Sequence, residues 1–114
     1  MPVMLQSALE GAPLVHQGKV RDTYDLGDTS LIVGSDRISA FDVVMANGIP
    51  DKGRILTQMS NFWFRKLADV CPHHLVATSD ADIAARVPRW HDGLSGRSVV
   101  VRKARPLTIE CVAR

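Results

Sequence analysis

The first third of the chain shows the two-residue alternation of apolar and polar side chains that is typical of β-strands. Residues 14–26 predict two strands that meet near Gly18, and residues 31–34 predict a third strand. Gly27-Asp28 lies between the second and third strands and favours a hairpin turn. The pattern therefore predicts an antiparallel meander.

The spacing of apolar side chains changes to three and four residues in the middle of the chain. This helical period runs from Arg54 to Val70, and Pro72 follows just beyond it. We therefore expect one main helix over residues 54–70. Because the aromatic residues 62–64 follow the same period, we expect them to pack in the core rather than to form a ligand site.

Weaker patterns predict the remaining elements. They are a short helix over residues 3–10, a period-two segment at 41–45, a strand at 73–78, a helix over 79–88 with Ser79 as its N-cap, and two strands within 97–114 that break at 104–106. The sum is an α+β fold in which an antiparallel sheet packs against one main helix, within one domain of residues 1–114. The last predicted strand reaches Arg114 without a turn or polar tail, so we expect a truncated chain or an N-terminal fragment.

Composition narrows the class of protein. The 114 residues are 46% apolar and 23% charged, as in globular chains. The net charge is only +2 and the basic residues are scattered, so we expect no nucleic-acid partner. The first residues do not show the pattern of a signal peptide, the sequence contains no long apolar run and no metal-ligand motif, and Cys71 and Cys111 show no CxxC spacing. We expect a cytoplasmic protein with no membrane partner, no metal site and two buried free thiols.

Gly18 and Lys19 form the first candidate binding site, because they lie where two predicted strands meet. A glycine there lets backbone amides approach a ligand closely, and a neighbouring lysine can neutralise phosphate charge. The alternative interpretation is a hairpin bend with a solvated lysine.

Asp36, Arg37, Ser39 and Asp42 form the second candidate site, at the end of a predicted apolar strand. An arginine offers two parallel donors to a carboxylate or phosphate, and two aspartates can hold Mg²⁺ or a substrate amine. The alternative is a local turn in which the serine caps a backbone group.

Three long motifs resemble the N-terminal part of the SAICAR synthetase family. They are QGKVRDTYDLGD, SDRISAFDVVMANGIPDKGRILTQMSNFWF and PLTIECVAR, and together they run through most of the chain. The resemblance implies an ATP-dependent ligase of purine biosynthesis. Such enzymes use ATP and Mg²⁺ to join L-aspartate to the carboxylate of the ribonucleotide CAIR, giving SAICAR, ADP and phosphate. It further implies that ATP phosphorylates the carboxylate, which the aspartate amine then attacks.

The resemblance also implies roles for single residues. The implied ATP contacts are Gly18, Lys19, Val20, Arg21, Arg105, Pro106, Leu107 and Glu110, and the implied catalytic or substrate contacts are Asp36, Arg37, Ser39, Asp42 and Arg114. The pair Lys52-Gly53 fits the family pattern without an assigned role.

Two departures from the family pattern affect this interpretation. Thr108 stands where the family commonly has proline, and the sequence ends at Arg114 whereas the family continues into a larger C-terminal lobe. We therefore expect the 114-residue chain to be inactive alone and prone to self-association. The alternative function is a non-catalytic module that binds a nucleotide or a partner protein.

Overall fold

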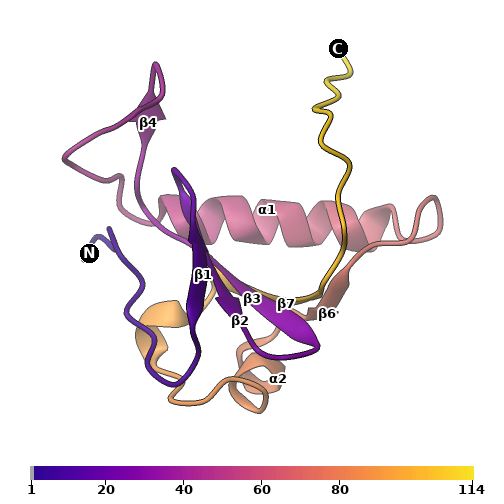
Figure 1. Cartoon of the computed structure of the whole chain (residues 1–114), viewed down its shortest axis with the longest axis horizontal. Helices are drawn as coiled ribbons and strands as arrows, with labels where there is room; N and C mark the ends of the chain where they lie inside the picture. Colours follow the sequence, from indigo (N-terminus) through magenta and orange to yellow (C-terminus); the bar gives the residue numbers. More distant parts are fainter. Residues whose placement is uncertain (1) are drawn as a thin grey trace.

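A five-stranded antiparallel sheet organises the chain, with α1 on one side and α2 on the other (Figure 1). The structure, a computed structural model, describes residues 2–114. Its elements are β1 (Leu14–Gln17), β2 (Arg21–Asp25), β3 (Thr29–Gly34), β4 (Ser39–Ala40), β5 (Val43–Val44), α1 (Lys52–Lys66), β6 (Leu75–Ala77), α2 (Asp80–Ala84), the 3₁₀ turn η1 (Asp92–Leu94) and β7 (Ser98–Arg102). The strands of the sheet lie in the order β1-β2-β3-β7-β6, and β4 pairs only with β5. The predicted α+β fold, an antiparallel sheet with one main helix, is confirmed.

The strands β1, β2 and β3 form the predicted meander, each pairing antiparallel with the next. Gly27 lies in the turn between β2 and β3 with φ of 98°, a conformation that favours glycine. β7 then pairs antiparallel with β3, so that this last strand of the described residues lies inside the sheet, between β3 and β6.

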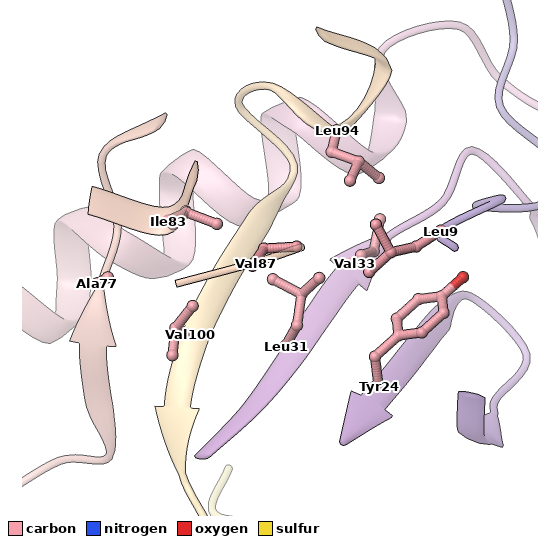
Figure 2. Close-up of a cluster of buried hydrophobic side chains, with 9 residues drawn as sticks. All are labelled: Leu9, Tyr24, Leu31, Val33, Ala77, Ile83, Val87, Leu94 and Val100. Atoms are coloured by element: carbon pink, nitrogen blue, oxygen red, sulfur yellow. The ribbon is translucent and has the colours of Figure 1, made fainter. Parts of the chain in front are cut away.

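The main core covers one face of the sheet (Figure 2). Tyr24 lies opposite Leu31, and Leu31 lies opposite Val100, so these three side chains share that face. Side chains from the N-terminal segment, from α2 and from the residues after it cover them, and the cluster is Leu9, Tyr24, Leu31, Val33, Ala77, Ile83, Val87, Leu94 and Val100. The core therefore joins β2, β3, β6 and β7 to the N-terminal segment and to α2, while all four residues of β1 are exposed.

Two smaller elements lie close to their predicted positions. β6 falls within the strand expected at residues 73–78. α2 is shorter than expected, but Ser79 is its N-cap, and the serine hydroxyl accepts a hydrogen bond from the Asp82 amide at 3.3 Å. The period-two segment at 41–45 contributes to the small β4–β5 hairpin.

α1 packs on the other face of the sheet at a glycine, where no side chain separates the helix backbone from the sheet backbone. The helix begins at Lys52 and ends at Lys66, and its buried residues are Gly53 and Asn61. A Cβ atom at Gly53 would lie 2.1 Å from the carbonyl oxygen of Gly34 at the end of β3. Only glycine permits this approach, so the sequence at this position fixes how closely helix and sheet meet.

The outer face of α1 is apolar and exposed, so the predicted core packing is wrong for Phe62 and Trp63, whereas Phe64 is half-buried. Ile55, Met59, Phe62 and Trp63 are 56%, 54%, 45% and 51% exposed. The helical period was interpreted correctly, but it marks a surface that no other part of residues 2–114 covers. At the start of the helix the inner face carries only Gly53, because the backbones of α1 and β3 lie too close there for a larger side chain.

The N-terminal segment does not form the helix expected over residues 3–10, so that prediction is wrong. The Met4 amide donates to Asp36 Oδ2 at 2.9 Å. The Ser7 amide donates to Asp22 Oδ2 at 3.2 Å. Because the backbone of this segment binds side chains of the sheet, it lies extended across them and does not make the local bonds of a helix.

The C-terminal segment, residues 103–114, is extended and pairs with no strand of the described chain, so the second strand expected there is wrong. Leu107 is 84% exposed. Pro106 has no amide hydrogen for a ladder bond. Cys71 and Cys111 are free thiols, as expected, but both are exposed, so their predicted burial is wrong.

Candidate functional site

The turn between β1 and β2 carries the first candidate residues. The Gly18 amide donates to the Arg21 carbonyl at 2.7 Å and closes the turn. The carbonyl oxygens of Gly18 and Lys19 face the protein, where both accept hydrogen bonds from Arg37. The Lys19 side chain is 54% exposed and forms an ion pair with Asp42. The sequence-predicted turn and its exposed lysine are therefore both present.

Arg37 lies behind this turn and is buried. Its guanidinium forms an ion pair with the buried Asp22 at 2.7 Å. The Asp22 carboxylate also accepts hydrogen bonds from the amide and the hydroxyl of Ser7, at 3.2 and 2.5 Å. These partners occupy both charged groups, so Arg37 and Asp22 support the turn from inside the protein.

Asp36 forms a second buried ion pair, with Arg97. The two side chains are 0% and 1% exposed and are joined by two hydrogen bonds of 2.9 and 3.2 Å. The amides of Met4 and Gly53 donate to the same carboxylate, each at 2.9 Å. Asp36 therefore joins the N-terminal segment, the first turn of α1 and the residue before β7.

Both buried carboxyl groups are held ionised. Burial alone would raise the pKa of Asp22, but hydrogen bonds from Arg37 and Ser7 outweigh it and hold this pKa below its usual value of 3.8. Burial likewise opposes ionisation of Asp36, and the bonds from Arg97 and from two backbone amides hold its pKa below 3.8.

These lowered pKa values predict acid unfolding. The stability that each pair contributes is present above pH 3.8 and is lost as the pH falls through the lower pKa of the folded state, because the unfolded chain binds more protons there. We expect the free energy of unfolding, measured by urea titration from pH 7 to 2.5, to fall steeply only below pH 3.8. Asp22→Asn should make this fall shallower, and an unchanged slope would contradict the prediction.

The β4–β5 hairpin carries Ser39 and Asp42 (Figure 1). Phe41 and Asp42 form its tip with φ of 50° and 63°, values that residues other than glycine rarely adopt. The Phe41 side chain is fully exposed. The hydrogen bond and charge of Lys19 lower the pKa of Asp42. Since both partners of this ion pair are exposed, an anionic ligand could take the place of the carboxylate beside Lys19.

A hollow of about 470 Å³ lies between α1 and the sheet. Val20 and Arg21 border it next to the β1–β2 turn, Ile32 lines it from β3, and Lys52 enters it from the start of α1. Burial and the neighbouring charges of His73 and Arg21 lower the pKa of His74, which also borders the hollow and is therefore mainly neutral at pH 7. The hollow thus combines an apolar strand with basic side chains at one end.

The remaining predicted contacts lie on the C-terminal segment. Arg105, Pro106, Leu107, Glu110 and Arg114 are all exposed, and the segment passes α1 on its way from β7 (Figure 1). It begins beside the β2–β3 turn, where an ion pair of 2.6 Å joins Lys103 to Asp25.

The two groups of predicted ATP contacts therefore lie near opposite ends of β2. The β1–β2 turn adjoins Arg21, the first residue of β2, and the C-terminal segment begins beside Asp25, the last. These ends are about 14 Å apart. The β1–β2 turn, the β4–β5 hairpin and the C-terminal segment project to the same side of the sheet as α1 (Figure 1). An extended nucleoside triphosphate could span this separation, with its base near the segment and its phosphates near the turn.

Comparison with known proteins decides the family. A sequence profile described as SAICAR synthetase matches residues 14–114. The chain belongs to the SAICAR synthetase family. It is 56% identical over 114 residues to the phosphoribosylaminoimidazole-succinocarboxamide synthase of Syntrophotalea carbinolica, and 49% identical over 112 residues to that of Geobacter sulfurreducens. These alignments cover 100% and 98% of this chain and 38% of each relative. The chain thus spans about 38% of the length of these SAICAR synthetases and corresponds to their N-terminal portion.

A solved structure agrees with this assignment. The structure described as SAICAR-synthase from Saccharomyces cerevisiae complexed SAICAR superimposes with a TM-score of 0.80 and 40% identity. The alignment covers 88% of this chain and 36% of the yeast chain. The α+β fold described above is therefore that of the N-terminal region of a SAICAR synthetase. Within residues 2–114, no helix is long and apolar enough to cross a membrane.

Sequence reasoning missed several residues that build this region of the SAICAR synthetase fold. Asp22 and Arg97 are the buried partners of Arg37 and Asp36, yet each lies at least 15 positions from its partner. Such pairing leaves no local signal in a single sequence. Lys52 had a family match without a role, and the structure places it in the hollow beside the turn.

Proposed function

We propose that this chain is the ATP-binding N-terminal lobe of a SAICAR synthetase, residues 1–114. In the whole enzyme, ATP would lie between this lobe and the C-terminal part. The observation that supports this most directly is the Gly18–Lys19 turn at one end of β2. Its lysine side chain is exposed, and its two carbonyl groups point into the protein and accept hydrogen bonds from Arg37. The family membership supplies the reaction, in which ATP drives the joining of L-aspartate to CAIR.

ATP would contact the chain along β2. In this proposal Gly18, Lys19, Val20 and Arg21 bind the phosphates. The backbone of Arg105, Pro106 and Leu107 would contact the adenine, and Glu110 lies in the same segment. Positive charge near the phosphates is needed because both reactants are anionic, and a carboxylate reacts with an amine only after its oxygen can leave as phosphate.

CAIR and L-aspartate would contact residues of the candidate site that are at least partly exposed. Ser39 and Asp42 lie on the hairpin beside Lys19, and Arg114 lies on the C-terminal segment; we propose all three as contacts to these substrates. Asp36 and Arg37 serve the same site from behind, because buried ion pairs occupy their charged groups.

Mg²⁺ is the second cofactor of the proposed reaction. Residues 2–114 contain no group of three or more His, Cys, Asp or Glu side chains placed to hold a metal ion. The described residues therefore do not provide a complete Mg²⁺ site, and we propose that the ion binds together with the ATP phosphates, which are its usual ligands. No catalytic step is assigned to it here.

The C-terminal part of the polypeptide is the partner this lobe needs. The outer face of α1 and the β4–β5 hairpin expose large apolar side chains, among them Phe41, Met59 and Trp63. Apolar patches of several hundred Å² favour association. We therefore propose that the 114-residue chain alone lacks ligase activity and self-associates, and that the relatives' remaining length supplies the second side of the active site.

Lys19→Ala tests the ATP site. Because this substitution removes a charge beside the phosphates, we expect ATP affinity to fall by about tenfold, the effect of one charge-assisted hydrogen bond. The melting temperature should stay nearly unchanged, since exposed ion pairs contribute little to stability. Titration of the chain with ATP and Mg²⁺, followed by NMR chemical shifts, measures both weak and strong binding.

Lys66→Ala is the matched control, because Lys66 is an exposed lysine at the far end of α1. Equal ATP affinity of wild type and Lys19→Ala would reject the assigned site. If the chain binds ATP but, together with the C-terminal part of a relative, releases no ADP in the presence of CAIR and aspartate, a non-catalytic nucleotide-binding module is the better interpretation.

A further inference from the structure

We propose that Arg37 is the positioning residue of the ATP-binding turn: its guanidinium holds the carbonyl groups of Gly18 and Lys19 inward and so directs the next amide groups outward. This inference rests on the proposed function, in which the turn binds phosphate. It changes the role expected for Arg37, which sequence motifs had placed on the substrate side of the site.

The guanidinium of Arg37 bonds to the turn at two successive residues. Its Nη2 donates to the Gly18 carbonyl at 3.0 Å, and its Nε donates to the Lys19 carbonyl at 3.2 Å. The next carbonyl, of Val20, accepts from both the amide and the hydroxyl of Ser35, at 3.0 and 2.8 Å. Three consecutive carbonyl groups of the turn are thus held by residues 35–37.

This arrangement determines where the amides of the turn point. In a trans peptide the N–H lies opposite the C=O of the same unit. The structure has no cis peptide bond within residues 2–114. When the carbonyls of Gly18 and Lys19 point toward Arg37, the amides of Lys19 and Val20 point away from it. Neither amide donates a hydrogen bond to any other group of the described residues. Successive free amides beside a lysine suit a phosphate oxygen.

Arg37 is itself rigidly held, which a positioning residue requires. It is 7% exposed. Its Nη2 also donates to Asp22 at 2.7 Å, and its Nη1 donates to the Leu5 carbonyl at 2.7 Å. Four acceptors, from the N-terminal segment, the β1–β2 turn and β2, therefore surround one planar group. A lysine cannot reproduce this set of contacts, because its donors all radiate from one nitrogen.

Arg37→Lys in the 114-residue chain tests the proposal, with Arg97→Lys as the matched control. Both variants remove a buried guanidinium that is paired with an aspartate, and both should lower the melting temperature. Only Arg37 touches the turn. The first readout is hydrogen exchange of the Gly18 amide, which donates to the Arg21 carbonyl at 2.7 Å, normalised to exchange in the core strands. The second readout is ATP affinity with Mg²⁺, measured by NMR titration.

We expect Arg37→Lys to speed exchange at Gly18 and to weaken ATP binding by about tenfold each, the factor for one lost charge-assisted hydrogen bond. Arg97→Lys should change neither after normalisation. The proposal is overturned if the two variants behave alike in both readouts. Asp22→Asn weakens the ion pair that fixes the Arg37 guanidinium, with little change in side-chain volume. It must therefore shift both readouts in the direction expected for Arg37→Lys. If Arg37→Lys does not fold, Asp22→Asn decides the question.

The test separates this inference from the proposed function. If ATP shifts no signal of residues 18–21 in the wild-type chain, ATP binding at the turn is rejected. The exchange rate at Gly18 then decides alone whether Arg37 positions the turn: faster exchange in Arg37→Lys than in Arg97→Lys supports it, and equal exchange overturns it.

Discussion

A Gly53→Ala chain should lose about 3 kcal/mol of its free energy of unfolding, a large fraction of the about 5–15 kcal/mol typical of a folded domain. The new Cβ would lie 2.1 Å from the Gly34 carbonyl oxygen and 2.8 Å from Nη1 of the buried Arg97. Neither neighbour can move freely, because one is sheet backbone and the other is bonded to Asp36. Urea unfolding followed by circular dichroism measures the loss.

Ser60→Ala is the control for this prediction. It places alanine in the same helix at an exposed position, where the higher helix propensity of alanine should leave stability unchanged or slightly raised. Since Gly53→Ala gains the same kind of helix propensity, any loss in that variant reports the steric contact. A Gly53→Ala chain as stable as the wild type would show that α1 and β3 do not approach each other as described.

Asp36→Ala should destabilise the chain by about 3–5 kcal/mol, the usual effect of removing one partner of a buried ion pair. The substitution leaves the Arg97 guanidinium, 1% exposed, without its carboxylate. It also leaves the amides of Met4 and Gly53 without their acceptor. The same urea titration measures the effect.

Two further variants separate a buried charge from a general effect of removing an aspartate. Asp25→Ala breaks a partly exposed pair with Lys103 and one hydrogen bond from the Gly27 amide, so it should destabilise the chain far less than Asp36→Ala. Asp36→Ala combined with Arg97→Met removes the charge left unpaired, so the double variant should be more stable than Asp36→Ala alone. If the double variant is the less stable of the two, the unpaired charge is not the source of the loss.

The sequence predicted the elements whose side-chain pattern is local. The meander of β1 to β3, the existence of α1 and the cap at Ser79 follow from spacing and turn residues, and all three are present. The outer face of α1 shows the limit of this reasoning. An apolar stripe predicts burial, but it does not say whether the partner lies within the same 114 residues.

The sequence predicted where the residues of the candidate turn lie, but it did not predict which residues hold that turn in place. Gly18 and Lys19 were placed correctly at a strand junction, since glycine and lysine at a turn have a local meaning. The roles of Asp36 and Arg37 were not predictable, because they depend on Arg97 and Asp22, which approach only in the folded chain. For the same reason the N-terminal segment could not be recognised as extended.

The position of β7 between β3 and β6 also sets the order in which the chain can fold. About 60 residues separate β3 from β7, and closing so long a loop costs more entropy than forming the local hairpins of β1 to β3. Folding should therefore be slow for a chain of this length, as it is for other sheets built from distant pairs. During synthesis, β1 to β3 leave the ribosome long before β7. Until β7 arrives, the open edge of β3 offers unpaired backbone groups to other nascent chains, and it is there that misassembly should begin.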